Sequence, residues 1–307
     1  MRSMGDVAAS HDPLWPNASS LLQRERRGDR RTVGLLGVST YATSLSARSA
    51  RSTPEAIRAA LARYSTWSYE DDADLAESVV MLDLGDVEEP DAPGALERVS
   101  AAMAPTRDDE LTIVLGGDNA ATYLALSALA GGDWRGVGLV TLDAHHDLRE
   151  GVSNGSPVRQ ALAAGLDGAH VVQVGLADFA NSPAYSQRAR ESGVHVVSRA
   201  ALRRESVESV IGHAIDVAAE GGRRVYVDLD FDVCDRSVVP ACPAGVPGGL
   251  SADELRRVAR AAGADERVAV VDLTEIDVAR DSADERTVRL AALVVLEALA
   301  GVIRRRT

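Results

Sequence analysis

The feature that most constrains the fold is a regular alternation of short apolar runs with longer helix-like segments, which begins near residue 32. The runs are rich in β-branched and aliphatic residues, as strands are, and cover residues 33–38, 79–84, 111–115, 137–142, 171–174, 194–197, 224–231 and 268–272. The helix-like segments cover residues 54–64, 120–130, 183–191, 206–219, 251–261 and 284–304. Strands that alternate with helices imply a parallel sheet buried on both faces. We therefore predict a three-layer α/β/α fold with a central, mostly parallel sheet of about eight strands.

Residues 1–31 lack this alternation and end in the charged stretch 24–31. We interpret them as an N-terminal tail that either lies over the domain or is disordered. Residues 32–307 show neither a linker nor an internal repeat. The sequence therefore predicts a single α/β catalytic domain over this range.

Composition excludes several classes of protein. The formal net charge is −13, whereas a nucleic-acid-binding surface needs basic stripes. No apolar run approaches the roughly 18–20 residues that span a bilayer, and residues 1–20 lack the basic-then-apolar order of a signal peptide. The two cysteines, Cys234 and Cys242, are too few for a disulfide framework. We expect a cytoplasmic protein that binds neither nucleic acid nor membrane.

Polar segments follow or end three of the predicted strands, where ligands bind in parallel α/β sheets. GGDN (116–119) follows the run at 111–115, and its paired glycines allow a sharp turn and a close backbone approach. DAHHD (143–147) follows the next strand, and DLDFD (228–232) ends a later one. These three segments are the candidates for a functional site.

DAHHD places three potential metal ligands on one side of the chain. Alternate residues of an extended segment point the same way, so Asp143, His145 and Asp147 can converge while His146 faces away. Carboxylate oxygens combined with an imidazole nitrogen suit Mn²⁺, Zn²⁺ or Fe²⁺. The alternative, for this segment taken alone, is a strand-end turn rich in polar caps.

DLDFD places three carboxylates, those of Asp228, Asp230 and Asp232, on one face of a buried strand. Without a counter-ion they would repel one another and titrate abnormally. An arginine would account for one of them but not for all three. Together with DAHHD, this segment predicts two metal ions that share ligands. Such a pair lowers the pKa of a bridging water and orients the resulting hydroxide, which predicts a hydrolase without a nucleophilic side chain.

At these residues the chain resembles the ureohydrolase family of arginase, agmatinase and formimidoylglutamase. The family markers GGDH, DAHxD and SxDxDxxDP occur in family order as GGDN (116–119), DAHHD (143–147) and DLDFDVCDR (228–236), and a Pro- and Gly-rich loop follows. TEID (274–277) lies where the family has a glutamate that contacts the amidine or guanidine group of the substrate. The likeness covers roughly residues 33–302. It implies an arginase-like fold, two Mn²⁺ ions, and a homotrimer or homohexamer.

The resemblance also implies a set of metal ligands, namely Asn119, Asp143, His145, Asp147, Asp230 and Asp232. In this register Asp228 falls where relatives often carry serine, and it is either a group behind the ligands or an added ligand. The family's first ligand, the histidine of GGDH, is replaced here by Asn119. An amide oxygen is a weaker, harder ligand than imidazole, so we expect the ion beside Asn119 to be bound more loosely.

Within the family, the pattern is closest to that of formimidoylglutamases. DLRE (147–150) and SNGSPVRQ (153–160) resemble their DLR … SGTPFRQ pattern, and VGLADFANS (174–182) resembles the same branch. The substrate-binding residues that this implies are Arg149, Asn154, Arg159 and Glu275. A guanidinium can hold a carboxylate through two hydrogen bonds. The alternative is that Arg149 and Arg159 only pair with nearby acids.

The reaction implied by this resemblance is hydrolysis of N-formimidoyl-L-glutamate to L-glutamate and formamide, in histidine degradation. Asp147 or Asp232 would accept the proton of the hydroxide and pass it to the leaving amine, while Glu275 orients the formimidoyl group. Two alternatives stay open. An agmatinase, guanidinobutyrase or other guanidino hydrolase that releases urea shares the metal centre, and the replacement at Asn119 also fits a metal-poor, non-catalytic relative.

Overall fold

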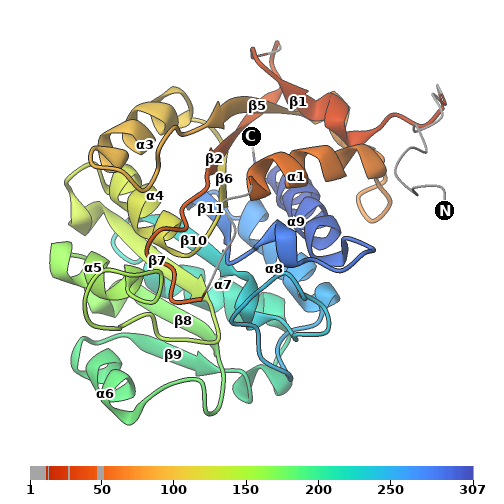
Figure 1. Ribbon diagram of the computed structural model, residues 1–307. Helices are drawn as coiled ribbons and strands as arrows, with labels where there is room; N and C mark the ends of the chain where they lie inside the picture. The colour runs from red at the N-terminus through yellow and green to blue at the C-terminus, as the bar shows by residue number, and fades with distance from the viewer. Residues whose placement is uncertain (1–11, 13, 27, 47–51, 307) are drawn as a thin grey trace.

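The computed structural model describes residues 12, 14–26, 28–46 and 52–306, and within them the chain forms a parallel sheet of nine strands (Figure 1). The strand order is β1-β5-β2-β6-β11-β10-β7-β8-β9. The strands are β1 (Leu22–Gln23), β2 (Arg31–Val38), β5 (Val79–Asp86), β6 (Leu111–Gly116), β7 (Val137–Leu142), β8 (Val171–Leu176), β9 (His195–Ser198), β10 (Arg224–Asp230) and β11 (Val268–Thr274). A separate antiparallel pair joins β3 (Trp67–Ser68) and β4 (Ala73–Asp74).

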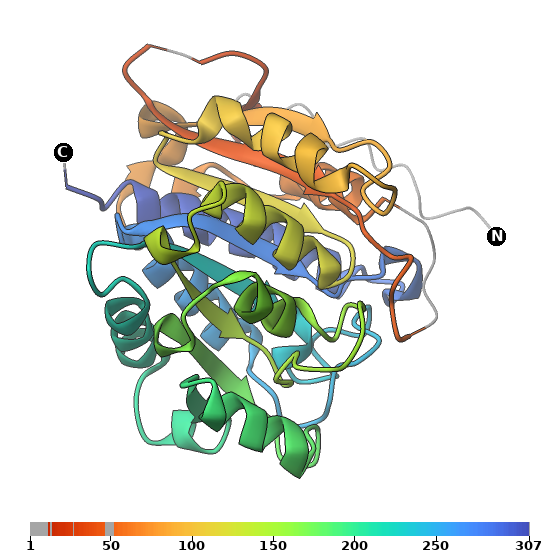
Figure 2. The ribbon, with the colours of Figure 1, turned by 90° about the vertical axis from the view of Figure 1, so that its left-hand side faces the viewer.

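Helices cover both faces of the sheet. One layer contains α1 (Thr53–Ala60), α7 (Val207–Ala218), α8 (Ala252–Ala264) and α9 (Arg286–Val302). The other, which faces the viewer in Figure 2, contains α3 (Ala95–Met103), α4 (Ala120–Ala130), α5 (Pro157–Ala164) and α6 (Pro183–Glu191). The short α2 (Leu75–Ser78) precedes β5. No helix in the described ranges is both long and apolar enough to cross a membrane.

Burial on both faces explains the composition of the central strands. Every residue of β6, β7, β8 and β11 is buried, which is why these strands read as continuous apolar runs and not as alternating ones. The apolar side chains form one core cluster under each helix layer. Polar residues that interrupt or follow these apolar runs do not contribute to the apolar core, so they are candidates for a functional role.

The predicted three-layer fold is confirmed, and each of the eight predicted apolar runs is a strand, with small shifts at the ends. The ninth strand, β1, lies inside the segment interpreted as a tail and pairs with β5 at the edge of the sheet, Leu22 with Met81 and Gln23 with Leu82. The division of the chain at residue 32 stays a prediction.

Two helices of the second layer, α3 and α5, were not predicted. Helix α5 starts at Pro157, inside the stretch interpreted from its resemblance as part of a substrate loop. Proline is well suited to the first turn of a helix, where its missing N–H costs nothing. The glycine that ends the helix, Gly165, has a φ of 119°, a conformation that disfavours other residues.

Candidate metal centre and substrate cavity

Four adjacent strands in the middle of the sheet, β6, β11, β10 and β7, carry the polar segments. Asn119 follows β6, DAHHD (143–147) follows β7, Asp230 ends β10 and Glu275 follows β11. The strands are parallel, so their carboxyl ends meet at one edge. There Asp230 pairs with Thr274, the residue before Glu275. The topology therefore gathers residues separated by more than a hundred positions.

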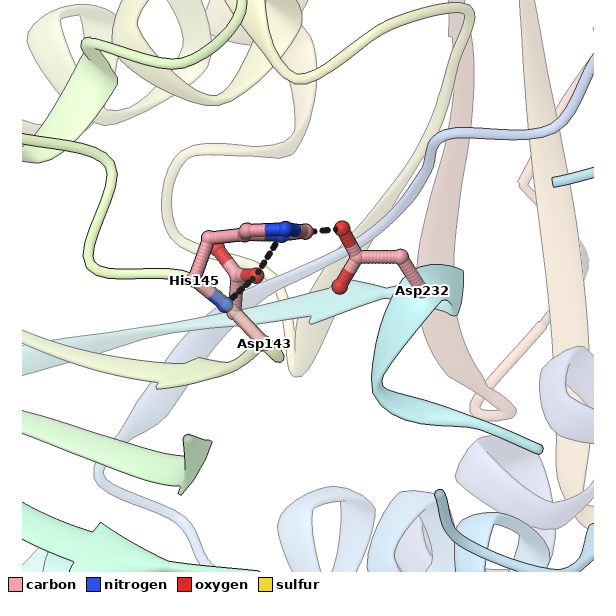
Figure 3. Close-up of side chains that lie close together, drawn as sticks. All are labelled: Asp143, His145 and Asp232. Atoms are coloured by element: carbon pink, nitrogen blue, oxygen red, sulfur yellow. Dashed lines mark hydrogen bonds and ion pairs between the residues drawn. The ribbon is translucent and has the colours of Figure 1, made fainter. Parts of the chain in front are cut away.

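Five of the six predicted metal ligands lie together at this edge. Their ligand atoms form two groups, in each of which all atoms lie within 4.8 Å of one another: Asp143, His145 and Asp232, and Asp143, Asp147 and Asp230. In the first group, His145 Nδ1 lies 2.7 Å from Asp232 Oδ2 and 3.4 Å from Asp143 Oδ1 (Figure 3). The arrangement offers two adjoining donor sets that share the carboxylate of Asp143.

This donor set fits a divalent cation. Oδ2 of Asp143 is buried and has no hydrogen-bond partner among the described residues. A buried carboxylate oxygen without a partner is costly unless a cation binds it. Several carboxylates with one imidazole suit Mn²⁺, Zn²⁺ or Fe²⁺.

Burial and mutual repulsion shift the titration of these groups. Burial, together with the charge of Asp232, raises the pKa of Asp147 to about 8 and raises the pKa values of Asp143 and Asp230 well above the usual carboxyl range. Burial alone would lower the pKa of His145, but the charge of Asp232 and its hydrogen bond raise it to about 9. Burial also opposes ionisation of Asp232, yet His145 outweighs it and the pKa of Asp232 is lowered. A cation among these groups would relieve the repulsion.

His146 points away from the carboxylates, as the alternation of DAHHD predicts. Its Nδ1 lies 2.7 Å from Oε1 of Gln173, and Gln173 donates in return to the carbonyl of His146. Asn181 donates to the carbonyl of Ala144 and accepts from the N–H of His146, both at 2.9 Å. These two amides, which hold the backbone of the metal-ligand segment, were missed by sequence reasoning. The sequence does contain one indication that Gln173 has a role, because this residue interrupts an otherwise apolar strand.

Two acids of the site have a left-handed backbone, Asp147 with a φ of 51° and Glu275 with a φ of 64°. Such conformations are unfavourable for non-glycine residues and are concentrated at functional sites. Oε1 of Glu275 accepts hydrogen bonds from the backbone N–H of Asn119 and from Nδ2 of Asn154, both at 2.9 Å. Glu275 therefore ties the end of β6 to the loop after β7.

The sixth predicted ligand, Asn119, lies beside the second group. Its Nδ2 donates to Oδ2 of Asp147 at 2.7 Å. Its Oδ1 faces the hydroxyls of Thr122 and Thr274, at 2.5 Å and 3.3 Å. The amide of Asn119 is thus in contact with the carboxylate cluster at one end and with two buried hydroxyls at the other.

Asp228 belongs to neither group of potential ligands. Burial and the neighbouring Asp272 raise its pKa well above the usual carboxyl range, and the hydroxyl of Thr274 lies 3.4 Å from its Oδ1. Of the two interpretations left open by the sequence, this placement favours a group behind the ligands.

A cavity of about 470 Å³, counted to its open mouth, adjoins the carboxylate cluster. Its lining includes Asp147, Arg149, Asn154 and Glu275. In the described part of the chain, no carboxylate forms an ion pair with the guanidinium of Arg149. A cationic group thus lines the same cavity as the acidic cluster.

Arg159 is placed differently from the other predicted substrate-binding residues, since it does not line this cavity. Its Nε donates to the carbonyl of Arg149 at 2.6 Å, and its Nη2 donates to the carbonyl of Gly151. Its own N–H donates to the carbonyl of Asp147. Arg159 therefore supports the segment that carries Asp147 and Arg149.

Comparison with known proteins shows relatives that match most of the chain. Residues 31–301 match the Arginase family. The chain belongs to that family. It is 34% identical to the formimidoylglutamase of Halalkalibacterium halodurans over 278 residues, which are 87% of this chain and 86% of that protein. The crystal structure of formimidoylglutamase from Bacillus subtilis aligns with a TM-score of 0.88 at 29% identity, over 100% of this chain and 97% of that one.

A structure of Trypanosoma cruzi formiminoglutamase with Mn²⁺ shares the fold, with a TM-score of 0.85 at 21% identity over 95% of this chain and 100% of that one. The residues of this chain that match the Arginase family begin at β2 and end in α9. The arginase-family part of the chain thus contains the whole carboxylate cluster and its cavity, and excludes β1.

Proposed function

We propose that this protein hydrolyses N-formimidoyl-L-glutamate to L-glutamate and formamide. Relatives named formimidoylglutamase, at 32% and 34% identity over 89% and 87% of the chain, support this assignment. The observation that carries it is the position of Arg149, whose guanidinium has no carboxylate partner among the described residues and shares a cavity with a cluster of buried carboxylates. That combination suits a substrate with an amidine at one end and carboxylates at the other.

Five of the six residues predicted from the sequence would hold the cations, and the sixth, Asn119, lies beside Asp147. His145, Asp143 and Asp232 would bind one Mn²⁺ ion, and Asp143, Asp147 and Asp230 the other. When bound, a pair of divalent cations lowers the pKa of water between them and so supplies a hydroxide nucleophile at neutral pH.

The chain itself positions the substrate. The guanidinium of Arg149 offers a carboxylate two parallel hydrogen bonds, and Asn154 lines the same cavity. Glu275 lies on its inner wall, where its carboxylate can pair with a cationic formimidoyl group. Arg159 donates hydrogen bonds to the carbonyls of Arg149 and Gly151. Its role would therefore be to support the loop that carries Arg149, and not to contact the substrate directly.

Asp147 and Asp232 are the groups that would move a proton. Without a cation, burial chiefly raises the pKa of Asp147 to about 8, and a bound cation would lower that pKa and leave the carboxylate ionised, ready to accept a proton. The carboxylate of Asp232, which lies 2.7 Å from Nδ1 of His145, is the second candidate. Either carboxylate can take a proton from the attacking water and return it to the leaving amine.

The test is product analysis with purified protein loaded with Mn²⁺. We expect formamide and glutamate from formimidoylglutamate, and little or no urea from agmatine, guanidinobutyrate or arginine. Urea release from guanidinobutyrate with an inert formimidoylglutamate would replace the proposal by a guanidino hydrolase, whose substrate carboxylate Arg149 would also accept. Inactivity on all four substrates, with no ion retained after loading, would favour a non-catalytic relative.

We extend the proposal to the setting of the enzyme. A cytoplasmic homo-oligomer, a trimer or hexamer, is implied by family likeness. Sedimentation analysis of the full chain tests the subunit number.

A further inference from the structure

Behind the carboxylate cluster lies a second set of buried polar groups that joins β10, β11 and α4. Asp272 accepts a hydrogen bond from the hydroxyl of Tyr226 at 2.6 Å and from the N–H of Leu229 at 3.3 Å. The hydroxyl of Thr122 lies 2.7 Å from the same carboxylate. Tyr226, Thr122 and Asp272 are each no more than 1% exposed. None of these residues reaches the cavity, so a direct contact with substrate does not explain them.

The hydroxyl of Thr122 has a neighbour on each side. Oγ1 lies 2.7 Å from Oδ2 of Asp272 and 2.5 Å from Oδ1 of Asn119. A hydroxyl carries one proton and can donate only once, although it can also accept. A carboxylate forms a stronger hydrogen bond with that proton than a neutral amide oxygen does. The proton of Thr122 therefore belongs with Asp272, and only lone pairs of Thr122 face Asn119.

A lone pair of the Thr122 hydroxyl can accept a hydrogen bond, and the Nδ2 group of Asn119 can donate one. Rotation of the amide by half a turn exchanges its oxygen and nitrogen without moving the backbone. Nδ2 would then donate to Thr122, and Oδ1 would face Oδ2 of Asp147, which lies 2.7 Å from the opposite end of the amide. Two oxygens at such a distance repel each other unless a cation lies beside both.

We propose that Thr122, held by Asp272, positions the amide of Asn119 with its oxygen toward the cation bound by Asp147. This inference rests on the proposed function, because it concerns the same metal centre. Thr122 is a positioning residue in it, and Asn119 is the ligand. An imidazole nitrogen in this place would be a ligand by itself, whereas an amide has one end that binds cations and one that repels them. A chain with asparagine here needs a partner that selects the binding end.

The cation in question is the one held by Asp143, Asp147 and Asp230, since Asn119 contacts Asp147. The other donor set, with His145 and Asp232, has no contact with Thr122 among the described residues. Loss of the Thr122 hydroxyl should therefore weaken one ion and spare the other. A general loosening of the fold would weaken both.

The experiment is titration of the full-length protein with Mn²⁺ alone, after removal of bound metal, with free Mn²⁺ followed by electron paramagnetic resonance. We expect Thr122→Val to weaken one of two sites about threefold to tenfold, the range set by loss of one hydrogen bond. Thr122→Ser keeps the hydroxyl and should bind both ions as the wild type does. The matched control is Thr66→Val, which removes another buried hydroxyl that has no described hydrogen-bond partner and lies away from the site.

Equal binding of both ions by Thr122→Val and wild type would overturn the proposal. So would equal weakening in Thr66→Val, or a wild type that binds a single ion however much Mn²⁺ is added. These outcomes are separate from failure of the proposed function, which is measured by formamide release from the wild type. Unchanged melting temperatures in the absence of Mn²⁺ show that Thr122→Val is folded, and a variant that melts early is replaced in the comparison by Thr122→Ala.

Discussion

Arg149 and Glu275 present opposite charges to one cavity, and in the proposed function they would therefore bind opposite ends of the substrate. Glu275 has a hydrogen-bonded carboxylate and a strained backbone, so its position is held by the surrounding structure. Arg149 is held through its backbone, by Gly155 and by the side chain of Arg159. In the proposed function, its guanidinium would bind a carboxylate of the substrate.

Replacement of Arg149 by alanine should raise KM for formimidoylglutamate about tenfold to a hundredfold, because a hydrogen bond to a charged group contributes about 1.5–3 kcal/mol. The content of bound Mn²⁺ should not change, since Arg149 is not among the potential ligands. Steady-state kinetics and metal analysis of the same preparation test both statements. Arg135→Ala, at an exposed arginine outside the cavity, is the matched control. An unchanged KM in Arg149→Ala would remove Arg149 from substrate binding.

At the scale of secondary structure, charged side chains join the helices of one layer. Glu297 of α9 accepts hydrogen bonds from Arg256 and Arg260 of α8. Glu208 of α7 is paired with Arg257 of α8 through two contacts, at 2.5 Å and 2.6 Å. Planar pairing of this kind favours a defined angle between helices, although its net stability is limited where water reaches it.

The Glu208–Arg257 pair predicts a specific pH dependence. The hydrogen bond from Arg257 lowers the pKa of Glu208 from 4.5 to about 2 in the folded state. A depressed carboxyl pKa contributes stability above the unfolded value, and that contribution is lost as the pH falls from 4.5 toward about 2. Both side chains are about 40% exposed, so solvent screening limits the contribution to about 1 kcal/mol at most.

Glu208→Gln should therefore lower the free energy of unfolding slightly at pH 7, and the difference from the wild type should shrink below pH 4.5. Urea denaturation at pH 7 and at successively lower pH measures this. Glu205→Gln, at an exposed glutamate that forms no ion pair with the described residues, should show no such trend. A difference that grows on acidification would contradict the assignment.

At the scale of the whole molecule, the candidate metal ligands come from neighbouring strands of the sheet, so a cation bound by them would join these strands through side chains. Asp143 and Asp147 follow β7, and Asp230 ends β10. Burial of these carboxylates and the repulsion between their charges oppose folding, as the raised pKa values of Asp143 and Asp230 indicate. A cation that binds the folded chain and not the unfolded one reverses this effect.

We therefore expect Mn²⁺ to raise the melting temperature by several degrees, since a ligand at a hundred times its Kd contributes about 2.7 kcal/mol. An excess of EDTA should reverse the rise. Asp143→Asn removes the carboxylate common to both donor sets, and its melting temperature should not respond to Mn²⁺. A rise of equal size in Asp143→Asn would show that the stabilising ion binds elsewhere.

Most of the fold could be predicted because a strand buried on both faces consists of a continuous run of apolar residues. The eight longer strands were recognised from such runs. The strand β1 was not, since Leu22 and Gln23 pair on one side only and are partly exposed. Helix α5 was not predicted, because residues 153–160 were interpreted only from their resemblance to a formimidoylglutamase pattern. That Asp143, His145, Asp147, Asp230 and Asp232 would lie together could be predicted because adjacent carboxylates are costly to bury at strand ends without a counter-ion. Gln173 and Asn181 were missed, because amides that hold a backbone follow no spacing rule.

By itself, the sequence determined which side chains are present at each strand end and on which side of DAHHD they point, since alternation along an extended chain is a local property. Only the tertiary structure decided which strands are neighbours, and hence that Asp143 serves both donor sets and that Thr122 lies between Asn119 and Asp272. Contacts between residues far apart in the chain depend on strand order and register, which arise from packing of the whole sheet.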